Sequence, residues 1–262
     1  MQDVKNTLKT YIQAGVTELY QDNIRNLISE KAAKKAINKN NLDNTAKKSS
    51  LISELKPINQ AVKEAKSQAD KAKTLSELKD ILSKFEGCEL YKTAKNLVFS
   101  DGDENSDVIL IGEAPGASED EQAIPFCGIS GKLLDDIFRS IGKTRDNNLY
   151  ITNSVFWRPP GNRRPTDEEI AICRPFVERH IYLKKPKLII LVGGTALASI
   201  LPDINDTISK IRGKIMQYKN PYLDNEIAIT AIFHPSYLLR QPLKKKIMWQ
   251  DMMMINNHLL NN

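Results

Sequence analysis

Acidic, amide and imidazole side chains stand in short loops of this sequence, each shortly after an apolar run. They are Glu113, Glu119, Asp120, Asn153 and His234. Carboxylates and imidazoles transfer protons or orient water, and a carboxamide presents a hydrogen-bond donor and an acceptor side by side. Such a set suits a site that reads the polar edge of a ligand and breaks a bond beside it.

The densest of these loops begins where the apolar run at 108–111 ends at Gly112. The small residues Gly112, Ala114 and Pro115 stand there among the three acids, and a Pro125-Phe126 step follows. Ligand sites in open α/β sheets lie at the carboxyl ends of strands, in loops of this type. We therefore predict that this stretch is the centre of the functional site.

The apolar runs that precede the loops are short and therefore predict buried strands. We expect strands at 108–111, 149–152, 188–192 and 227–233. Helical patterns occupy residues 131–141, 167–183, 195–201 and 243–260. Thr166 and Glu169 form a capping box that starts the second of these helices, and Pro175 inside it predicts a kink or a restart. Alternating strands and helices indicate an α/β protein: a three-layer α/β/α sandwich with a central four-stranded parallel sheet.

The N-terminal third has a different composition, poor in aromatic residues and rich in Lys, Ala and Asn. We place a domain boundary near residue 74, where Thr74 and Glu77 form a capping box. Residues 1–73 then form a helical, lysine-rich extension with a flexible linker, and residues 74–262 form the catalytic domain. The whole formal net charge of +6 falls within residues 1–84. This charge attracts nucleic acid or belongs to a solvated lysine-rich helix, and the interspersed acids favour the second interpretation.

The sequence shows no apolar stretch long enough to span a membrane and no signal-peptide core at its N-terminus. We therefore expect a cytoplasmic protein, and we expect it to be a monomer. The cysteines are an odd number, three, at wide spacings, which argues against a disulfide framework.

Motifs in register carry a more specific signal. The segments GEAPG…ED…PF, TN…RPPGNR and HPSYLLR occur in this order and spacing. They resemble the family 4 uracil-DNA glycosylases over roughly residues 85–253. The resemblance implies a monofunctional enzyme that hydrolyses the N-glycosidic bond of uracil in DNA, giving free uracil and an abasic site, after extruding the nucleotide. The alternative is a catalytically weak or inactive damaged-DNA-binding protein of the same fold, and the intact polar residues of the loops weigh against it.

By residue type alone, we interpret Phe126 as a core residue and His234 as a structural residue. Asn153 is equally compatible with a turn cap and with a recognition residue. The resemblance implies ligand roles for all three. Phe126 then stacks on uracil, and Asn153 accepts from N3–H and donates to O4, where cytosine presents the opposite pattern. His234 donates to O2 as negative charge develops there. Gly112, Ala114 and Pro115 complete the substrate-binding loop.

The acids and the DNA contacts follow from the same resemblance. Glu119 and Asp120 together orient the water or stabilise the sugar cation, whereas Glu113 takes part or braces the loop. We expect DNA contacts from Arg158 and Arg163, which face phosphates, and from the wedge residues Leu238, Leu239 and Arg240. A further hypothesis gives residues 1–73 the task of recruiting a repair or replication protein.

The resemblance also implies an iron–sulfur cluster held by four cysteines. Only Cys88 and Cys173 stand at matching positions, whereas Phe85 and Trp157 occupy the other two and Cys127 lies in the pocket loop. We predict that no cluster is bound and that aromatic packing fills the volume. In addition, Ala123 stands where relatives often have Gly, so a positive φ at this position would be strained.

Overall fold

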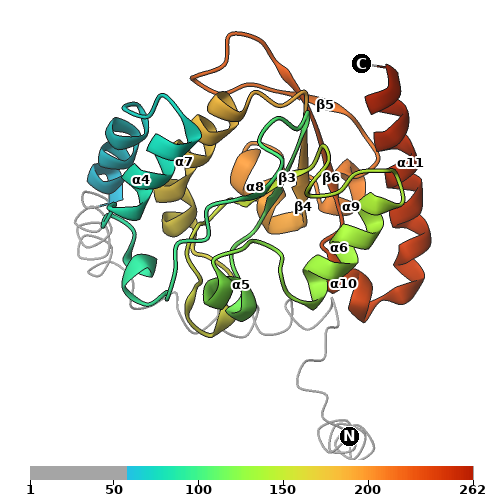
Figure 1. Cartoon of the computed structure of the whole chain (residues 1–262), viewed down its shortest axis with the longest axis horizontal. Coiled ribbons are helices and arrows are strands. Elements are labelled where there is room, and N and C mark those ends of the chain that lie inside the picture. The colour runs from blue at the N-terminus through green and yellow to red at the C-terminus, as the bar shows by residue number, and fades with distance from the viewer. Residues whose placement is uncertain (1–57, 262) are drawn as a thin grey trace, which may run out of the picture. The chain divides into compact units, whose positions relative to one another are not determined.

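The computed structural model describes residues 58–261, and the expected helices and linker before residue 58 lie outside this range. Within it the strands form one six-stranded sheet in the order β1-β3-β2-β4-β6-β5 (Figure 1). The strands are β1 (Asp101–Gly102), β2 (Val108–Gly112), β3 (Tyr150–Asn153), β4 (Leu188–Val192), β5 (Met216–Tyr218) and β6 (Ile227–Ile232). The four central strands are parallel, as the sequence predicted.

The two edge strands were not expected. β1 pairs with β3 and β5 pairs with β6, both in the antiparallel direction. They comprise only two and three residues, and none of the residues of β1 is fully buried. Such short, half-exposed strands have no apolar run, so the sequence carries no signal for them.

The described helices are a helix at residues 58–69, α4 (Leu75–Ser83), α5 (Ala117–Gln122), α6 (Ile129–Arg139), α7 (Asp167–Lys184), α8 (Gly194–Ile200), α9 (Ile208–Ile211), α10 (Pro235–Arg240) and α11 (Lys245–Asn261). The four predicted helices, α6, α7, α8 and α11, begin and end close to their predicted limits, whereas the short helices α5, α9 and α10 were not expected. Three 3-10 turns cover Glu89–Lys92, Pro160–Asn162 and Pro242–Lys244. The capping box of Thr166 and Glu169 is present, and α7 continues through Pro175 without a restart. Buried neighbours such as Phe176 hold the helix against the core on both sides of the missing hydrogen bond.

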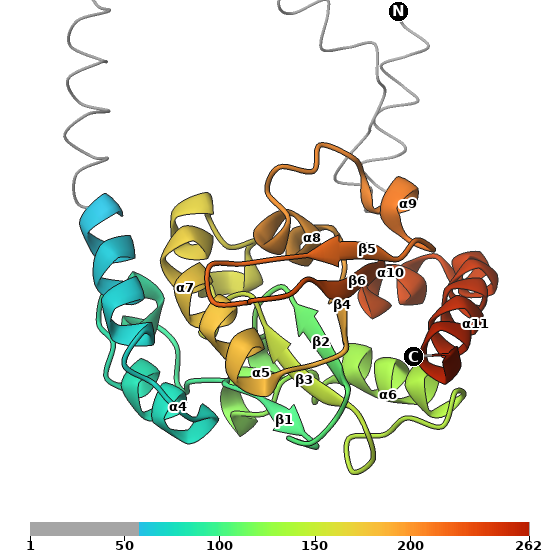
Figure 2. The ribbon, with the colours of Figure 1, turned by 90° about the horizontal axis from the view of Figure 1, so that it is seen from above.

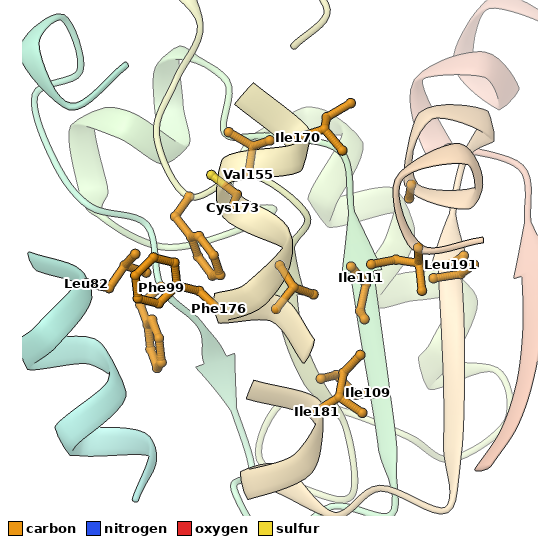
Figure 3. Close-up of a cluster of buried hydrophobic side chains, with 14 of the residues drawn as sticks. Leu82, Phe99, Ile109, Ile111, Val155, Ile170, Cys173, Phe176, Ile181 and Leu191 are labelled. Atoms are coloured by element: carbon orange, nitrogen blue, oxygen red, sulfur yellow. The ribbon is translucent and has the colours of Figure 1, made fainter. Parts of the chain in front are cut away.

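Helices cover both faces of the sheet, which confirms the three-layer arrangement (Figures 1 and 2). Side chains alternate along each strand. In β2, Ile109 and Ile111 join a core cluster with α4, α7 and α8, whereas Val108 and Leu110 join a second cluster with α6, α10 and α11. Figure 3 shows part of the first cluster, from Leu82 through Phe176 to Ile111 and Leu191. None of the described helices is long and apolar enough to cross a membrane.

The compact unit starts earlier than the expected boundary near residue 74. Its described part begins at residue 58, because the helix at 58–69 and the turn after it pack on the first core cluster through Ala65, Ala69 and Ala72, each fully buried. Nε of Arg179 donates to the carbonyl oxygen of Ala72 over 2.9 Å. Alanines among lysines look like an exposed helix in the sequence, and only the neighbouring helices show that they are buried.

Candidate active site

A cavity of about 490 Å³ lies at the carboxyl edge of the parallel strands. Loops after β2, β3 and β6 supply its walls. The lining residues are Glu113, Ala114, Pro115, Gly116, Ala117, Ser118, Glu119, Phe126, Gly128, Ile129, Ser130, Asn153, Pro159, Asn162, Arg163, His234 and Ser236. Residues far apart in the sequence thus meet in one place, because parallel strands end at the same edge of a sheet.

Asn153 lines this cavity and carries a buried acceptor without a hydrogen-bond partner. Its side chain is 2% exposed, and Oδ1 has no hydrogen-bond partner among the residues that the structure describes. Asn153 pairs in register with Gly112 of β2. A buried acceptor without a partner costs about 1–3 kcal/mol, so its presence indicates a donor that arrives with a ligand.

The aromatic ring of Phe126 forms a wall beside this amide. The residue is 7% exposed and has a φ of 53°, which is uncommon for any residue with a side chain. Its ring centroid lies 5.7 Å from that of His234, with an interplanar angle of 33°. Phe126, Asn153 and His234 therefore adjoin the same cavity.

His234 caps helix α10, and this contact fixes its tautomer. The backbone N–H of Ser236 donates to Nδ1 over 3.2 Å, and Oγ of Ser236 lies 2.8 Å from the same atom. Because a backbone N–H can only donate, Nδ1 is unprotonated and Nε2 carries the hydrogen of the neutral ring. Burial, with a further contribution from Arg240, lowers the pKa of His234 to about 4, and nearby Glu119 opposes this shift. His234 is thus a neutral donor at physiological pH.

Asp120 was expected in the site, but it makes structural contacts with the backbone of another segment. Oδ1 of Asp120 accepts the backbone N–H groups of Lys95 and Asn96 over 2.9 and 3.0 Å, and the residue is 6% exposed. It is not among the lining residues of the cavity. Its carboxylate fastens the segment before β1 to helix α5, so Asp120 holds the structure together in place of forming the cavity wall.

Glu119 and Glu113 also differ from their expected roles. Glu119 lines the cavity and braces the loop, because Oε2 accepts from the N–H of Gly116 over 3.1 Å and Oε1 from that of Gly128 over 3.0 Å. Glu113 lines the cavity as well, and its carboxylate has no hydrogen bond or ion pair within residues 58–261. Glu113 is therefore the acid free to contact a ligand or water.

The expected wedge residues on helix α10 differ in their exposure to solvent. Leu238 is fully buried in the second core cluster, so its side chain packs in the core in this structure and does not reach the surface. Leu239 is 41% exposed, and Arg240 is exposed at the end of the same helix. Ile129, which the sequence analysis did not single out, lies at the cavity rim and is 76% exposed. Its position three residues after the Pro125-Phe126 step was the only available signal.

The loop arginines are engaged in contacts within the protein. Arg163 forms a two-bond ion pair with Glu169, with Nη2–Oε1 and Nη1–Oε2 distances of 2.6 and 2.8 Å. Nε of Arg158 donates to Oδ1 of Asn162 over 2.7 Å. These bonds hold the loop after β3 in one shape at the edge of the cavity.

The buried thiols of Cys88 and Cys173 are hydrogen-bonded to each other, and this bond together with burial raises the pKa of Cys173 well above its ordinary value. Phe85 packs on Phe176 at 4.9 Å, and Trp157 is buried in the same cluster. Cys127 belongs to the loop of Phe126. Two thiols do not fit a cluster that needs four thiolates, and residues 58–261 contain no group of three His, Cys, Asp or Glu arranged for a metal ion.

Ala123 has a φ of 58° at the end of helix α5, in the left-handed region. The strain expected for an alanine at this position is therefore present.

The known proteins similar to this chain include several type-4 uracil-DNA glycosylases. The model of the Uracil DNA glycosylase superfamily matches residues 99–253. The type-4 uracil-DNA glycosylase of Sulfurisphaera tokodaii is 33% identical over 68% of this chain and 81% of its own length. That of Pyrobaculum aerophilum is 34% identical over 69% of this chain and 92% of its own. That of Archaeoglobus fulgidus is 38% identical over 59% and 78%.

Proposed function

The chain belongs to the uracil-DNA glycosylase superfamily and is a DNA glycosylase that excises uracil in DNA repair, and we propose that its cavity does so by monofunctional hydrolysis. In this reaction the oxygen of a water bonds to C1′ of the deoxyribose while the bond from C1′ to N1 of uracil breaks. The products are free uracil and an abasic site. A Schiff-base route needs a lysine, and none stands among the described residues that line the cavity.

The unpaired Oδ1 of Asn153 is the observation that carries the proposal. Uracil N3–H donates to this oxygen, and the amide nitrogen of Asn153 donates to uracil O4. Cytosine presents an acceptor at N3 and a donor at C4, so it leaves both amide groups unpaired. A site built on such hydrogen bonds rejects the wrong ligand by factors of about 10⁴–10⁵. The ring of Phe126 stacks on the base and adds affinity without discrimination.

His234 stabilises the departing base. Negative charge develops on uracil O2 as the glycosidic bond breaks, and Nε2–H of the neutral imidazole donates to this oxygen. A neutral donor matches the reaction because it strengthens its hydrogen bond as the charge grows and keeps its proton. The contact with Ser236 keeps Nε2 as the donor.

Glu113 is the carboxylate that we propose for the water. It lines the cavity and has no partner within residues 58–261, so it accepts the water proton as the new C–O bond forms. Glu119 lies close enough to raise the pKa of His234. Its negative charge stabilises the positive charge that develops on the deoxyribose. Gly112, Ala114 and Pro115 bring the backbone of the loop close to the base.

DNA binding by nucleotide extrusion completes the proposal. Leu239 enters the space left by the extruded base, and Arg240, Arg158 and Arg163 contact the flanking phosphates. The exposed side chain of Ile129 stands at the rim of the cavity, where it supports the neighbouring bases. Association with chromosomal DNA in the cytoplasm follows from this substrate.

We also propose that the enzyme works without an iron–sulfur cluster. Only two thiols meet at the position of Cys88 and Cys173, and aromatic side chains of Phe85 and Trp157 pack around them. Iron and sulfide analysis of protein purified without oxygen checks this directly. Bound iron in equimolar or larger amounts would contradict the proposal.

The N-terminal extension is proposed to recruit a repair or replication protein. Because Ala65, Ala69 and Ala72 belong to the core, the informative deletion removes residues 1–55 and not 1–73. This deletion should leave excision from a short oligonucleotide intact and abolish capture of the partner. Loss of oligonucleotide excision would instead assign these residues to DNA binding.

The decisive experiment measures release of uracil from a labelled oligonucleotide by the wild type and by Asn153→Ala. We expect cleavage at the abasic site after alkali for the wild type and a loss of at least 100-fold for the variant. Asn257→Ala, on the exposed face of α11, serves as the control with full activity. Undiminished excision by Asn153→Ala, or binding of uracil-containing DNA by the wild type without turnover, would defeat the proposal.

A further inference from the structure

Arg145, in the loop between α6 and β3, connects four oxygen atoms beneath the Phe126 loop. Its side chain is 18% exposed and does not line the cavity. The guanidinium donates to Oδ1 of Asp135 (3.0 Å), Oδ2 of Asp101 (2.6 Å) and the carbonyl oxygens of Pro125 (2.8 Å) and Phe126 (2.6 Å). Arg145 thus joins β1, α6 and the loop that carries the aromatic wall.

The two carbonyl contacts determine the conformation of one residue. The carbonyl of Pro125 lies in the peptide plane before the Cα of Phe126, and the carbonyl of Phe126 lies in the plane after it. The angles φ and ψ of Phe126 relate these two planes. Because one rigid guanidinium holds both carbonyls, it fixes both angles and therefore the direction of the Cα–Cβ bond.

Phe126 needs this support because its backbone is strained. A φ of 53° costs about 1–2 kcal/mol for a residue with a Cβ. The neighbouring backbone is also tight, since a Cβ placed on Gly131 would lie 1.6 Å from the carbonyl oxygen of Phe126. Without an external restraint the loop would relax to a negative φ, and the ring would leave its place beside His234 and Asn153.

We propose that Arg145 is a positioning residue for uracil recognition, which acts only through the Phe126 ring and rests on the proposed function of that ring. Asp101 and Asp135 approach the guanidinium from two different elements and orient it for the carbonyl contacts. Lysine would keep the charge but has no planar fork to hold two carbonyls and two carboxylates together. The orientation of the Phe126 ring, and with it the affinity for uracil, therefore depends on arginine at this position.

The test is a double-mutant cycle with Arg145→Lys and Phe126→Ala. Inhibition by free uracil and the KM for a single-stranded uracil oligonucleotide are measured for both single variants and the double variant. We expect Arg145→Lys to raise the inhibition constant of uracil by roughly 10-fold, within the range that stacking provides. In the Phe126→Ala background the same change should have no further effect.

Arg212→Lys is the matched control. Arg212 has the same 18% exposure and pairs with a carboxylate of Asp251, with an Nε–Oδ2 distance of 2.8 Å, but lies outside the cavity lining. It should lower the melting temperature without changing the inhibition constant. If Arg145→Lys does not fold, Asp135→Ala, which removes one of the four contacts, takes its place in the cycle.

An equal loss of uracil affinity in the presence and absence of the Phe126 ring would overturn the proposal, as would no loss at all from Arg145→Lys. A wild-type protein that neither excises nor binds uracil would instead refute the proposed function. The two failures are therefore distinguishable.

Discussion

Gly112 and Asn153 are direct neighbours in the register of β2 and β3, and they are so close that no side chain fits between them. A Cβ on Gly112 would lie 2.4 Å from Oδ1 of Asn153 and 2.5 Å from the ring of Phe126. The glycine thus leaves room for the amide and the aromatic ring to adjoin. The geometry of recognition depends on this missing methyl group.

We therefore expect Gly112→Ala to lower kcat/KM for uracil excision by about 100-fold, since a displacement of about 1 Å can cost this much. Steady-state kinetics on a single-stranded uracil oligonucleotide check the prediction. Gly194→Ala is the control, because a Cβ there meets no atom within 4 Å. Equal activities of the two variants would show that the space at Gly112 is irrelevant.

Substitutions of the two acids Glu113 and Asp120 should change different properties of the enzyme. Glu113→Gln is expected to lower the single-turnover rate by 100-fold or more with an unchanged melting temperature, because its carboxylate has no protein partner within residues 58–261. Asp120→Asn should mainly lower the melting temperature, because Asp120 accepts two backbone N–H groups. A larger loss of rate in Asp120→Asn than in Glu113→Gln would reverse our assignment of the water.

Protonation of His234 should destabilise the protein in acid. The pKa is about 4 in the folded state and about 6.5 in the unfolded chain, so unfolding takes up a proton between these values. The contribution to stability is complete above pH 6.5 and is lost as the pH falls towards 4, by roughly 1–2 kcal/mol at pH 5.

Urea unfolding at pH 7.5 and 5.0 tests this, with His234→Asn as the comparison because asparagine keeps the helix cap without titrating. The wild type should lose more stability than the variant. Identical losses would mean that His234 titrates normally. Because His234 has this low pKa in the folded protein, it does not titrate near pH 6.5. The pH profiles of excision by the wild type and by His234→Asn should therefore not differ by an inflection near pH 6.5.

Ala123→Gly should stabilise the protein. The φ of 58° at this position strains alanine but not glycine, and relief of the strain is worth about 1 kcal/mol. Thermal unfolding should show a higher melting temperature. A lower melting temperature would indicate that the flexibility gained by the unfolded chain outweighs the strain.

Substitutions of the two leucines of α10 should affect different properties, namely excision for Leu239 and stability for Leu238. Leu239→Ala is expected to reduce excision from double-stranded DNA by at least 10-fold and from single-stranded DNA much less, because an exposed wedge acts only where a base stack must be held open. Leu238→Ala should instead lower stability by about 2–5 kcal/mol, since this side chain is fully buried. Equal losses on both substrates for Leu239→Ala would exclude a wedge.

The sequence by itself determined the central sheet, the long helices and the loops that carry the site. The alternation of strands and helices, capping boxes such as that of Thr166 and Glu169, and apolar runs such as Val108–Ile111 are local patterns, and the structure follows them closely. Asn153 and His234 were identified because each stands at the end of a predicted strand and belongs to a motif that resembles the family, and the carboxyl ends of parallel strands meet at one edge.

Only the tertiary structure decided which side chains in those loops face the cavity. Asp120 and Glu113 are equivalent in the sequence, yet contacts with Lys95 and Asn96, more than twenty positions away, turn Asp120 into an anchor. Leu238 and Leu239 are adjacent and chemically alike, and packing against α6 buries the first. Side-chain direction in a loop is set by elements distant along the chain, whereas strand and helix patterns repeat locally and can be read in order.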